Sequence, residues 1–328
     1  RCDLLDLVDK LLRTFREKED LPFGGCQVLL IGDAFQLPPI AQDDHWNLLK
    51  QHYKSPFFFD SHVLTKHKPH YIELKKIYRQ KDDVFINLMN NIRENNVSEE
   101  DMQLLNSRFI PSITKNQNLQ FVTIATHNRI VDEINNKKLA ELNSELKIYK
   151  AEVNGNFPES IYPTDFNLNL KIGSQIMFIK NDPEKRFYNG KIGTVVQMDD
   201  EKIFIEVPEG KIIDVKQDIW SNINYSWDAK NSKIVEEVIG EFMQFPIKLA
   251  WSVTVHKCQG LTFENVIADI SNSFSPGQVY VALSRCRSME GLILKSRVLR
   301  SAIKTDPNVL EFTKLEHNQD DNQLFDYF

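Results

Sequence analysis

Hydrophobic and polar positions follow two different periods along this chain of 328 residues. Up to about residue 150, and again after Phe245, short apolar runs such as Leu119–Ala125 alternate with segments in which apolar residues recur at helical spacing, as at Phe85, Leu88 and Ile92. Such runs are typical of strands, and a spacing of three or four residues is typical of helices. Strands that alternate with helices predict an α/β fold with a parallel sheet.

The helical period fades between residues 151 and 245, where turn-forming pairs such as Asn189-Gly190 separate short apolar segments. Strands are predicted at Ile176–Ile179, Gly193–Met198, Ile203–Val207 and Ile212–Val215. Short strands with turn signals between them predict a β-meander, so this stretch is a small all-β insertion. Phe187 and Tyr188 would either pack in its core, which is the simpler expectation, or be exposed for stacking.

Several boundaries can be predicted from single residues. An amphipathic helix over residues 2–18 is stopped by Pro22, and the apolar run Gln27–Ile31 is typical of a parallel strand buried on both faces. The segment Ser98–Asp101 predicts a helix start with a capping box. Residues 305–328 are polar and acidic, which predicts a weakly ordered tail or a linker.

Four polar segments carry residues suited to nucleic-acid chemistry. A strand that begins near Trp251 runs into the turn Thr254–Gly260, whose hydroxyl, imidazole, amine and amide groups could hold phosphates or stack on bases. A helix predicted over Pro276–Cys286 then delivers Arg285, a permanently charged guanidinium in an apolar setting. The other two segments are Val28–Pro39, which contains Gly32, Asp33 and Gln36, and Ile77–Gln80, which contains Arg79.

In this order and with this spacing, the four segments resemble the motor motifs of superfamily-one DNA helicases of the RecD and PIF-type branch, over about residues 1–295. The resemblance implies a RecA-like parallel-sheet motor domain with an SH3-like all-β insertion. It also implies ATP and Mg²⁺ as cofactors, single-stranded DNA as the partner, and 5′-to-3′ movement. The implied domains are residues 1–68 (remainder of a first RecA-like domain plus connector), 69–150 with 246–304 (second RecA-like domain), 151–245 (insertion) and 305–328 (acidic tail or linker).

The resemblance also assigns roles to individual residues. Those expected to be catalytic, at the γ-phosphate of ATP, are Gln36, Arg79 and Arg285. The nucleotide-binding positions are Gly32, Asp33, Gln36, Arg79, Gly260 and Arg285. The DNA-binding positions are Thr126, His127, Asn128, Thr254, His256, Lys257 and Gln259. Cys258 departs from the family pattern, which usually has Ser there.

Structural alternatives stand beside these roles: Gln36 could simply end a buried strand, Arg79 could be a surface cation and His256 a core histidine, with the functional role favoured for each. Arg285 at a helix C-terminus would interact favourably with the helix macrodipole, although the functional role is favoured. Asn128 would either bind phosphate at a helix N-terminus or simply cap its own helix, and these two interpretations remain equally supported.

The phosphate-binding loop Gly-x-x-x-x-Gly-Lys-[Ser/Thr] does not occur in the chain. The nearest string, Asn189–Gly193, is better interpreted as a β-turn. With the start at Arg1, this predicts a fragment cut just after an acidic Mg²⁺-binding pair, which lacks the N-terminal RecA-like half required for nucleotide binding and has no ATPase activity alone. The alternative function is a non-catalytic single-stranded DNA-binding or scaffold module, against which the two arginines Arg79 and Arg285 argue.

Charge and cysteines limit the partners and the compartment. A net charge of −6 argues against indiscriminate nucleic-acid binding over the whole surface, but not against a local groove. Residues 54–79 are locally basic and form either a solvated face or a surface near DNA, with equal support. Four cysteines without a C-x-x-C pair predict reduced thiols of the cytoplasm and no structural zinc site. A cytoplasmic protein of bacterial or phage type is expected. No apolar run approaches the ~20 residues of a membrane span.

Overall fold

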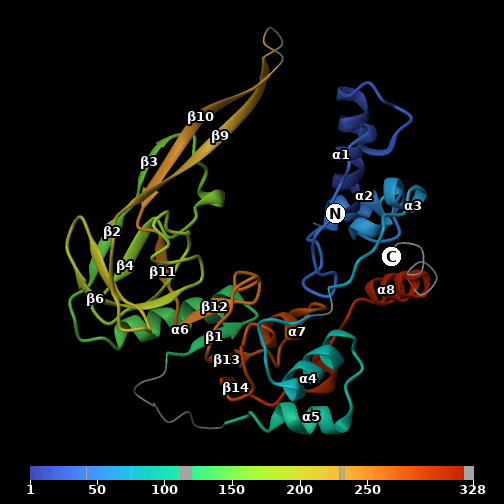
Figure 1. Cartoon of the computed structure of the whole chain (residues 1–328). Helices are drawn as coiled ribbons and strands as arrows, with labels where there is room; N and C mark the ends of the chain where they lie inside the picture. The colour runs from blue at the N-terminus through green and yellow to red at the C-terminus, as the bar shows by residue number, and fades with distance from the viewer. Residues whose placement is uncertain (42, 75, 111–119, 229–230, 232, 321–328) are drawn as a thin grey trace. The chain divides into compact units, whose positions relative to one another are not determined.

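The computed structural model describes residues 1–41, 43–74, 76–110, 120–228, 231 and 233–320 (Figure 1). The chain divides into two compact units, residues 1–113 with 270–328 and residues 114–269. The fold is mixed α/β with one parallel sheet and several antiparallel sheets, as the sequence predicts.

The first unit is mostly helical. Its described elements are α1 (Cys2–Phe15), η1 (Pro22–Gly25), α2 (Asp43–Leu49), η2 (Phe58–Asp60), α3 (His62–Lys66), α4 (Asp83–Arg93), α5 (Glu99–Asn106), α7 (Gln278–Leu283), β14 (Leu292–Leu294), η4 (Arg300–Ala302) and α8 (Pro307–Asp320).

The predicted strand over Gln27–Ile31 is wrong. These residues belong to no helix or sheet, and the side chains of Leu29 and Ile31 are 80% and 86% exposed. A strand buried on both faces needs neighbouring strands to take its backbone hydrogen bonds. No described residues of the first unit form a strand beside it.

Helices α4 and α5 form where the sequence predicts them. Phe85, Leu88 and Ile92 bury one face of α4. The capping box at Ser98 is complete, because its hydroxyl accepts from the Asp101 N–H and the Asp101 carboxylate accepts from the Ser98 N–H. Local sequence signals therefore suffice to place these two helices.

The expected weakly ordered tail instead contains helix α8, while residues 321–328 lie outside the described residues. Phe312 on α8 stacks on Phe59 with ring centroids 4.4 Å apart, and Tyr71 packs edge-on against it at 5.8 Å. Lys54 also pairs with Glu311 at 2.7 Å. Aromatic packing holds α8 on the connector, a tertiary effect that local composition does not reveal.

The second unit combines strands with the α-helix α6 and the short 3-10 helix η3. Its described elements are β1 (Val122–Ala125), α6 (Asn128–Ala140), β2 (Lys147–Lys150), β3 (Glu152–Gly155), η3 (Glu159–Ile161), β4 (Asn167–Leu170), β5 (Gln175–Phe178), β6 (Ile192–Met198), β7 (Ile203–Glu206), β8 (Ile212–Val215), β9 (Asp218–Asp228), β10 (Lys233–Gln244), β11 (Ile247–Leu249), β12 (Ser252–Thr254) and β13 (Val266–Asp269).

Strand β1 lies between β12 and β13 and is parallel to both. All four of its residues are buried. Asn135 of α6 binds the backbone of β12, accepting from Ser252 N–H and donating to Ser252 O at 2.9 and 3.1 Å. This is the parallel sheet that the alternating pattern predicts.

The predicted meander is confirmed: strands β5 to β8 are consecutive antiparallel neighbours, and β11 adds a fifth strand beside β5. Their inward side chains form one hydrophobic core, which includes Ile176, Phe178, Val195, Ile205 and Ile213. Antiparallel strands run from Lys147 to Leu249, slightly beyond the predicted insertion limits, which themselves remain a prediction.

A long hairpin of β9 and β10 was not predicted. It extends as a two-stranded ribbon from the rest of the antiparallel strands (Figure 1). Tyr225 and Trp227 on β9 are each 62% exposed. Its sequence lacks a clean apolar–polar alternation, because neither face of the outer ribbon is buried.

No helix in the described part of the chain is long and apolar enough to cross a membrane.

Phe312→Ala should lower the free energy of unfolding by about 2 kcal/mol, less than a fully buried Phe because the ring is only partly buried. Chemical denaturation followed by circular dichroism measures this change. Phe15→Ala is the matched control, since that ring is 78% exposed and should matter little. Equal effects of the two substitutions would contradict the anchoring of α8.

Candidate functional site

Helix α7 is the centre of the predicted nucleotide-binding residues in the first unit. It is shorter than predicted and begins at Gln278, after Gly277 in a left-handed conformation with φ +76°. A β-carbon at Gly277 would lie 2.4 Å from the carbonyl oxygen of Gln36. Only glycine permits this backbone approach, which places the loop of Asp33 and Gln36 directly on the start of α7.

Asp33 organises that loop. Its carboxylate accepts from the backbone N–H of Phe35 and from the Gln36 side-chain amide, both at 3.0 Å. The hydroxyl of Tyr280 on α7 lies 3.4 Å from the same carboxylate. Burial, and secondarily the negative charge of Asp33, raises the pKa of Tyr280 to about 12, so its hydroxyl stays protonated and able to donate.

The two predicted arginines meet at Ser284, just after α7. Arg79 donates to the Ser284 carbonyl oxygen at 3.0 Å, and Arg285 donates to the Ser284 hydroxyl at 2.8 Å. Arg285 is only 2% exposed and also donates to the carbonyl of Val281 at 2.9 Å. Burial lowers the pKa of Arg79. The geometry therefore brings both guanidinium groups together and shows Arg285 holding the C-terminal turn of α7, as its structural alternative proposes.

Sequence reasoning missed two neighbours of this cluster. Tyr280 could have been recognised as a polar side chain in an otherwise apolar helix, two positions after Gln278. Arg93 of α4 gives no such signal, yet its guanidinium lies 5.0 Å from the centroid of the Phe35 ring and 2.8 Å from Glu94. It packs the motif loop against α4, which lies beside α7 (Figure 1).

The predicted DNA-contacting segments lie together in the second unit. Ala125 and Thr254, the last residues of β1 and β12, are partners in the parallel register. The segments that follow them, Thr126–Asn128 and Val255–Gly260, therefore leave the same edge of the sheet. Ligands of open α/β sheets bind at this carboxyl edge.

Within these segments the hydroxyl groups have structural partners. Thr254 is buried and its hydroxyl accepts from the Lys257 N–H at 3.3 Å, and buried Thr126 lies 2.7 Å from the His127 ring nitrogen. The exposed members are His127, Asn128, His256, Lys257 and Gln259. The threonines thus shape the two loops, and their neighbours face solvent.

The structure shows what Asn128 and Cys258 do in these two loops. Asn128 is the first residue of α6 and does not cap it, because His127 occupies the N-cap position and makes no side-chain capping bond. Cys258 is fully buried, with its sulfur 3.2 Å from the Val255 carbonyl oxygen. A serine hydroxyl at this position would point into the turn rather than outward.

The glycines predicted for the nucleotide fall in different units. Gly32 is exposed, with no atom within 4 Å of where a β-carbon would lie, next to Asp33 in the first unit. Gly260 lies in the second unit beside the DNA-contacting loops, with φ +83° and open space where a β-carbon would lie. The first unit alone therefore assembles Gly32, Asp33, Gln36, Arg79 and Arg285.

Lys257 interacts electrostatically with two further charged side chains, Lys248 and Asp165. Lys248 on β11 is half-buried, and this burial together with the charge of Lys257 lowers its pKa to about 8. Burial raises the pKa of Asp165, against the opposing effect of Lys257 and Lys248. Two cations close to one another in a partly desolvated setting are a favourable environment for an anion.

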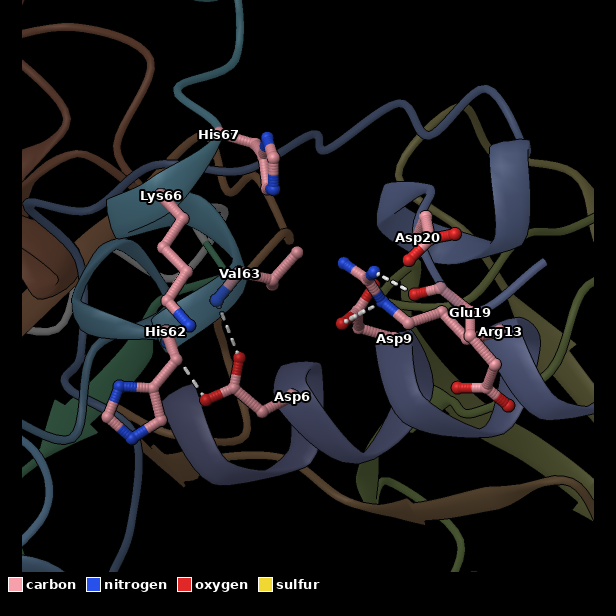
Figure 2. A pocket seen from close by; sticks show the side chains of 9 residues that line it. All are labelled: Asp6, Asp9, Arg13, Glu19, Asp20, His62, Val63, Lys66 and His67. Carbon is pink, nitrogen blue, oxygen red and sulfur yellow. Dashed lines mark hydrogen bonds and ion pairs between the residues drawn. The ribbon is translucent and has the colours of Figure 1, made fainter.

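A hollow of about 450 Å³ lies elsewhere, between α1 and α3 (Figure 2). Asp6 accepts from the N–H groups of His62 and Val63 at 2.9 Å, and Asp9 pairs with Arg13 at 2.8 Å. These carboxylates already have structural partners, and their charge opposes a phosphate. The hollow does not match the predicted nucleotide site.

The described residues contain no group of three or more His, Cys, Asp or Glu side chains that could hold a metal ion. Two lysines of the basic segment 54–79 make contacts within the protein. Lys54 forms an ion pair with Glu311, and the Lys76 ammonium lies 5.0 Å from the centroid of the Tyr78 ring. Lys75 lies outside the described residues.

Known proteins match this chain over the segments that carry these motifs. Residues 1–103 match the family model described as PIF1-like helicase. The chain is 30% identical to the ATP-dependent DNA helicase Pif1 of Bdellovibrio bacteriovorus, covering 94% of this chain and 66% of that protein. It is also 30% identical to human ATP-dependent DNA helicase PIF1, covering 95% of this chain and 46% of that protein.

Solved structures extend the match to the whole fold. Pif1 from Bacteroides sp in complex with ADP-AlF4 is 38% identical, with a TM-score of 0.85 over 97% of this chain and 73% of that chain. The chain belongs to the PIF1-like helicase family. Bacteroides Pif1 bound to single-stranded DNA matches with a TM-score of 0.73. The chain spans about half to two thirds of the length of the curated relatives named above.

Lys248 should make stability depend on pH. Its pKa is about 8 in the folded protein and 10.5 when unperturbed, so the unfolded chain binds more protons between these values and stability rises with pH there. Lys248→Met should be more stable than the parent near pH 7 and should lose this rise. Thermal unfolding between about pH 7 and pH 9.5 measures it, below the titration of tyrosines. An unchanged rise in the variant would contradict the burial of this charge.

Proposed function

We propose that this chain is the C-terminal motor portion of an ATP-dependent DNA helicase that translocates on single-stranded DNA in the 5′-to-3′ direction. The proposal rests on the position of three residues around the short helix α7. Gln36, Arg79 and Arg285 are far apart in the sequence, yet each lies at an end of this helix. A chain that only bound DNA would not need both arginines, which disfavours the non-catalytic alternative.

In this proposal the residues around α7 respond to the γ-phosphate of ATP. Gln36 would sense the phosphate, and the two guanidinium groups would stabilise charge as it develops during phosphoryl transfer. Arg285 would exchange its bonds to Val281 and Ser284 for bonds to phosphate. That exchange couples hydrolysis to α7, because the same side chain holds the end of the helix.

The phosphate loop Gly-x-x-x-x-Gly-Lys-[Ser/Thr] is not among these 328 residues. We therefore place the main nucleotide contacts in an N-terminal RecA-like half beyond this sequence. This chain alone would have no appreciable ATPase activity and would contribute one side of a DNA groove.

The DNA side of the proposal rests on the carboxyl edge of β1 and β12. His256, Lys257 and Gln259 are exposed there, next to His127 and Asn128. Backbone and side-chain donors at such an edge can hold phosphates without reading sequence. This suits a motor that must move along any strand.

In a longer protein that also carries the phosphate loop, Arg285→Ala should lower kcat for ATP hydrolysis by about 10³- to 10⁵-fold while ATP affinity changes little. Affinity depends mainly on the phosphate loop, whereas the guanidinium acts on the transition state. Phosphate release and a nucleotide-binding titration measure the two quantities separately. Arg287→Ala, at an exposed position two residues later, is the control. A kcat near that of the parent would make Arg285 a purely structural residue.

The isolated chain should bind single-stranded DNA weakly, with a shallow salt dependence of about −0.7 per neutralised phosphate. Replacing both His256 and Lys257 by Ala should remove most of this binding, since they are exposed cations or donors on the turn. Fluorescence anisotropy of a labelled poly-dT strand at two salt concentrations measures it.

Two controls accompany this titration. Lys216→Ala removes an exposed lysine of the same unit but off the turn, and Cys258→Ser should bind like the parent because its side chain is buried. If the double variant bound DNA as tightly as the parent chain, the turn would not be the DNA grip.

A further inference from the structure

The loop between β5 and β6 presents one aromatic ring to solvent and buries its neighbour. Phe187 is in the core and stacks on Phe178 with centroids 4.0 Å apart. Tyr188, for which the sequence favoured a core position, is instead 57% exposed. An exposed tyrosine beside a buried aromatic anchor cannot be explained by core packing.

The backbone under Tyr188 is fixed. Its carbonyl accepts from Lys191 N–H at 3.0 Å, Gly190 N–H donates to Phe178 O at 2.8 Å, and Asn189 N–H donates to the Asn181 side chain at 2.9 Å. The Lys191 ammonium also lies 5.9 Å from the Tyr188 ring centroid. A ring held on such a turn loses little conformational entropy when it binds a ligand.

The same turn packs against the proposed DNA grip within the second unit. A β-carbon at Gly190 would lie 2.6 Å from the Leu261 side chain, and Gly190 has φ +96°. Leu261 N–H in turn donates to Cys258 O at 3.0 Å, inside the turn Thr254–Gly260. A short and rigid path of contacts therefore connects Tyr188 to the turn that carries His256 and Lys257.

We propose that Tyr188 is a stacking platform for a nucleobase of the single strand held by the Thr254–Gly260 turn. This inference rests on the proposed function and adds a base contact to its phosphate contacts. Every base has a π-face, so stacking on tyrosine tolerates any sequence. The contact carries no charge, which suits a chain whose net charge is −6 and whose turn exposes few cations.

The test compares Tyr188→Ala and Tyr188→Phe in the 328-residue chain by anisotropy of a labelled dT oligonucleotide. Loss of the ring should weaken binding by about fivefold to a hundredfold, the range for one base–aromatic stack, while Phe keeps the affinity. The salt slope should stay the same, because no phosphate contact is lost. Tyr225→Ala, which removes a similarly exposed ring of the β9–β10 hairpin, is the matched control.

A second arm uses strands with one abasic site moved along the oligonucleotide. For the parent chain one position should weaken binding most, and Tyr188→Ala should be insensitive at that position. If Tyr188→Ala binds like the parent while the His256 and Lys257 double variant does not, the platform is wrong and the grip stands. If the parent chain binds no single strand at all, the proposed function fails and the platform with it.

Discussion

The parallel pairing of β1 with β12 is the constraint on which the second unit depends. The two strands are far apart in sequence, and all the antiparallel strands from Lys147 to Leu249 are inserted between them. Their register sets Ala125 beside Thr254, so both polar loops start at one edge of the sheet. An insertion of this size is tolerated because its ends return to adjacent strands, and the cost of closing a long loop rises only slowly with its length.

In the first unit, the comparable constraint is the close backbone approach at Gly277. Because that residue has no side chain, the carbonyl of Gln36 can rest on the start of α7, and the Asp33 carboxylate can meet Tyr280. At the other end of the helix Arg285 is bonded to Val281 and Ser284. A short helix with a motif loop at one end and two arginines at the other can transmit a change at either end as a rigid body.

The sequence predicts elements well where local signals decide them and poorly where partners do. The capping box at Ser98 and the strands β5 to β8 follow from turn residues and alternation. The segment Gln27–Ile31 has the composition of a buried strand but no described neighbour to pair with. Helix α8 forms through the contact of Phe312 with Phe59, which composition cannot reveal. At the site, residue types were predictable, but burial of Thr126, Thr254 and Arg285 depends on packing.

Charge explains why the proposed DNA grip would be local. The chain carries a net charge of −6, and partial burial, with the charge of Lys257 as a second cause, lowers the pKa of Lys248 to about 8. Adding further cations there would lower such pKa values again, so charge density at the turn is self-limiting. A motor must also release each nucleotide as it advances, which a dense cationic groove would oppose. Donors, backbone groups and aromatic faces give contacts that hold a strand without that penalty, and the exposed residues around β1 and β12 are mostly of this kind.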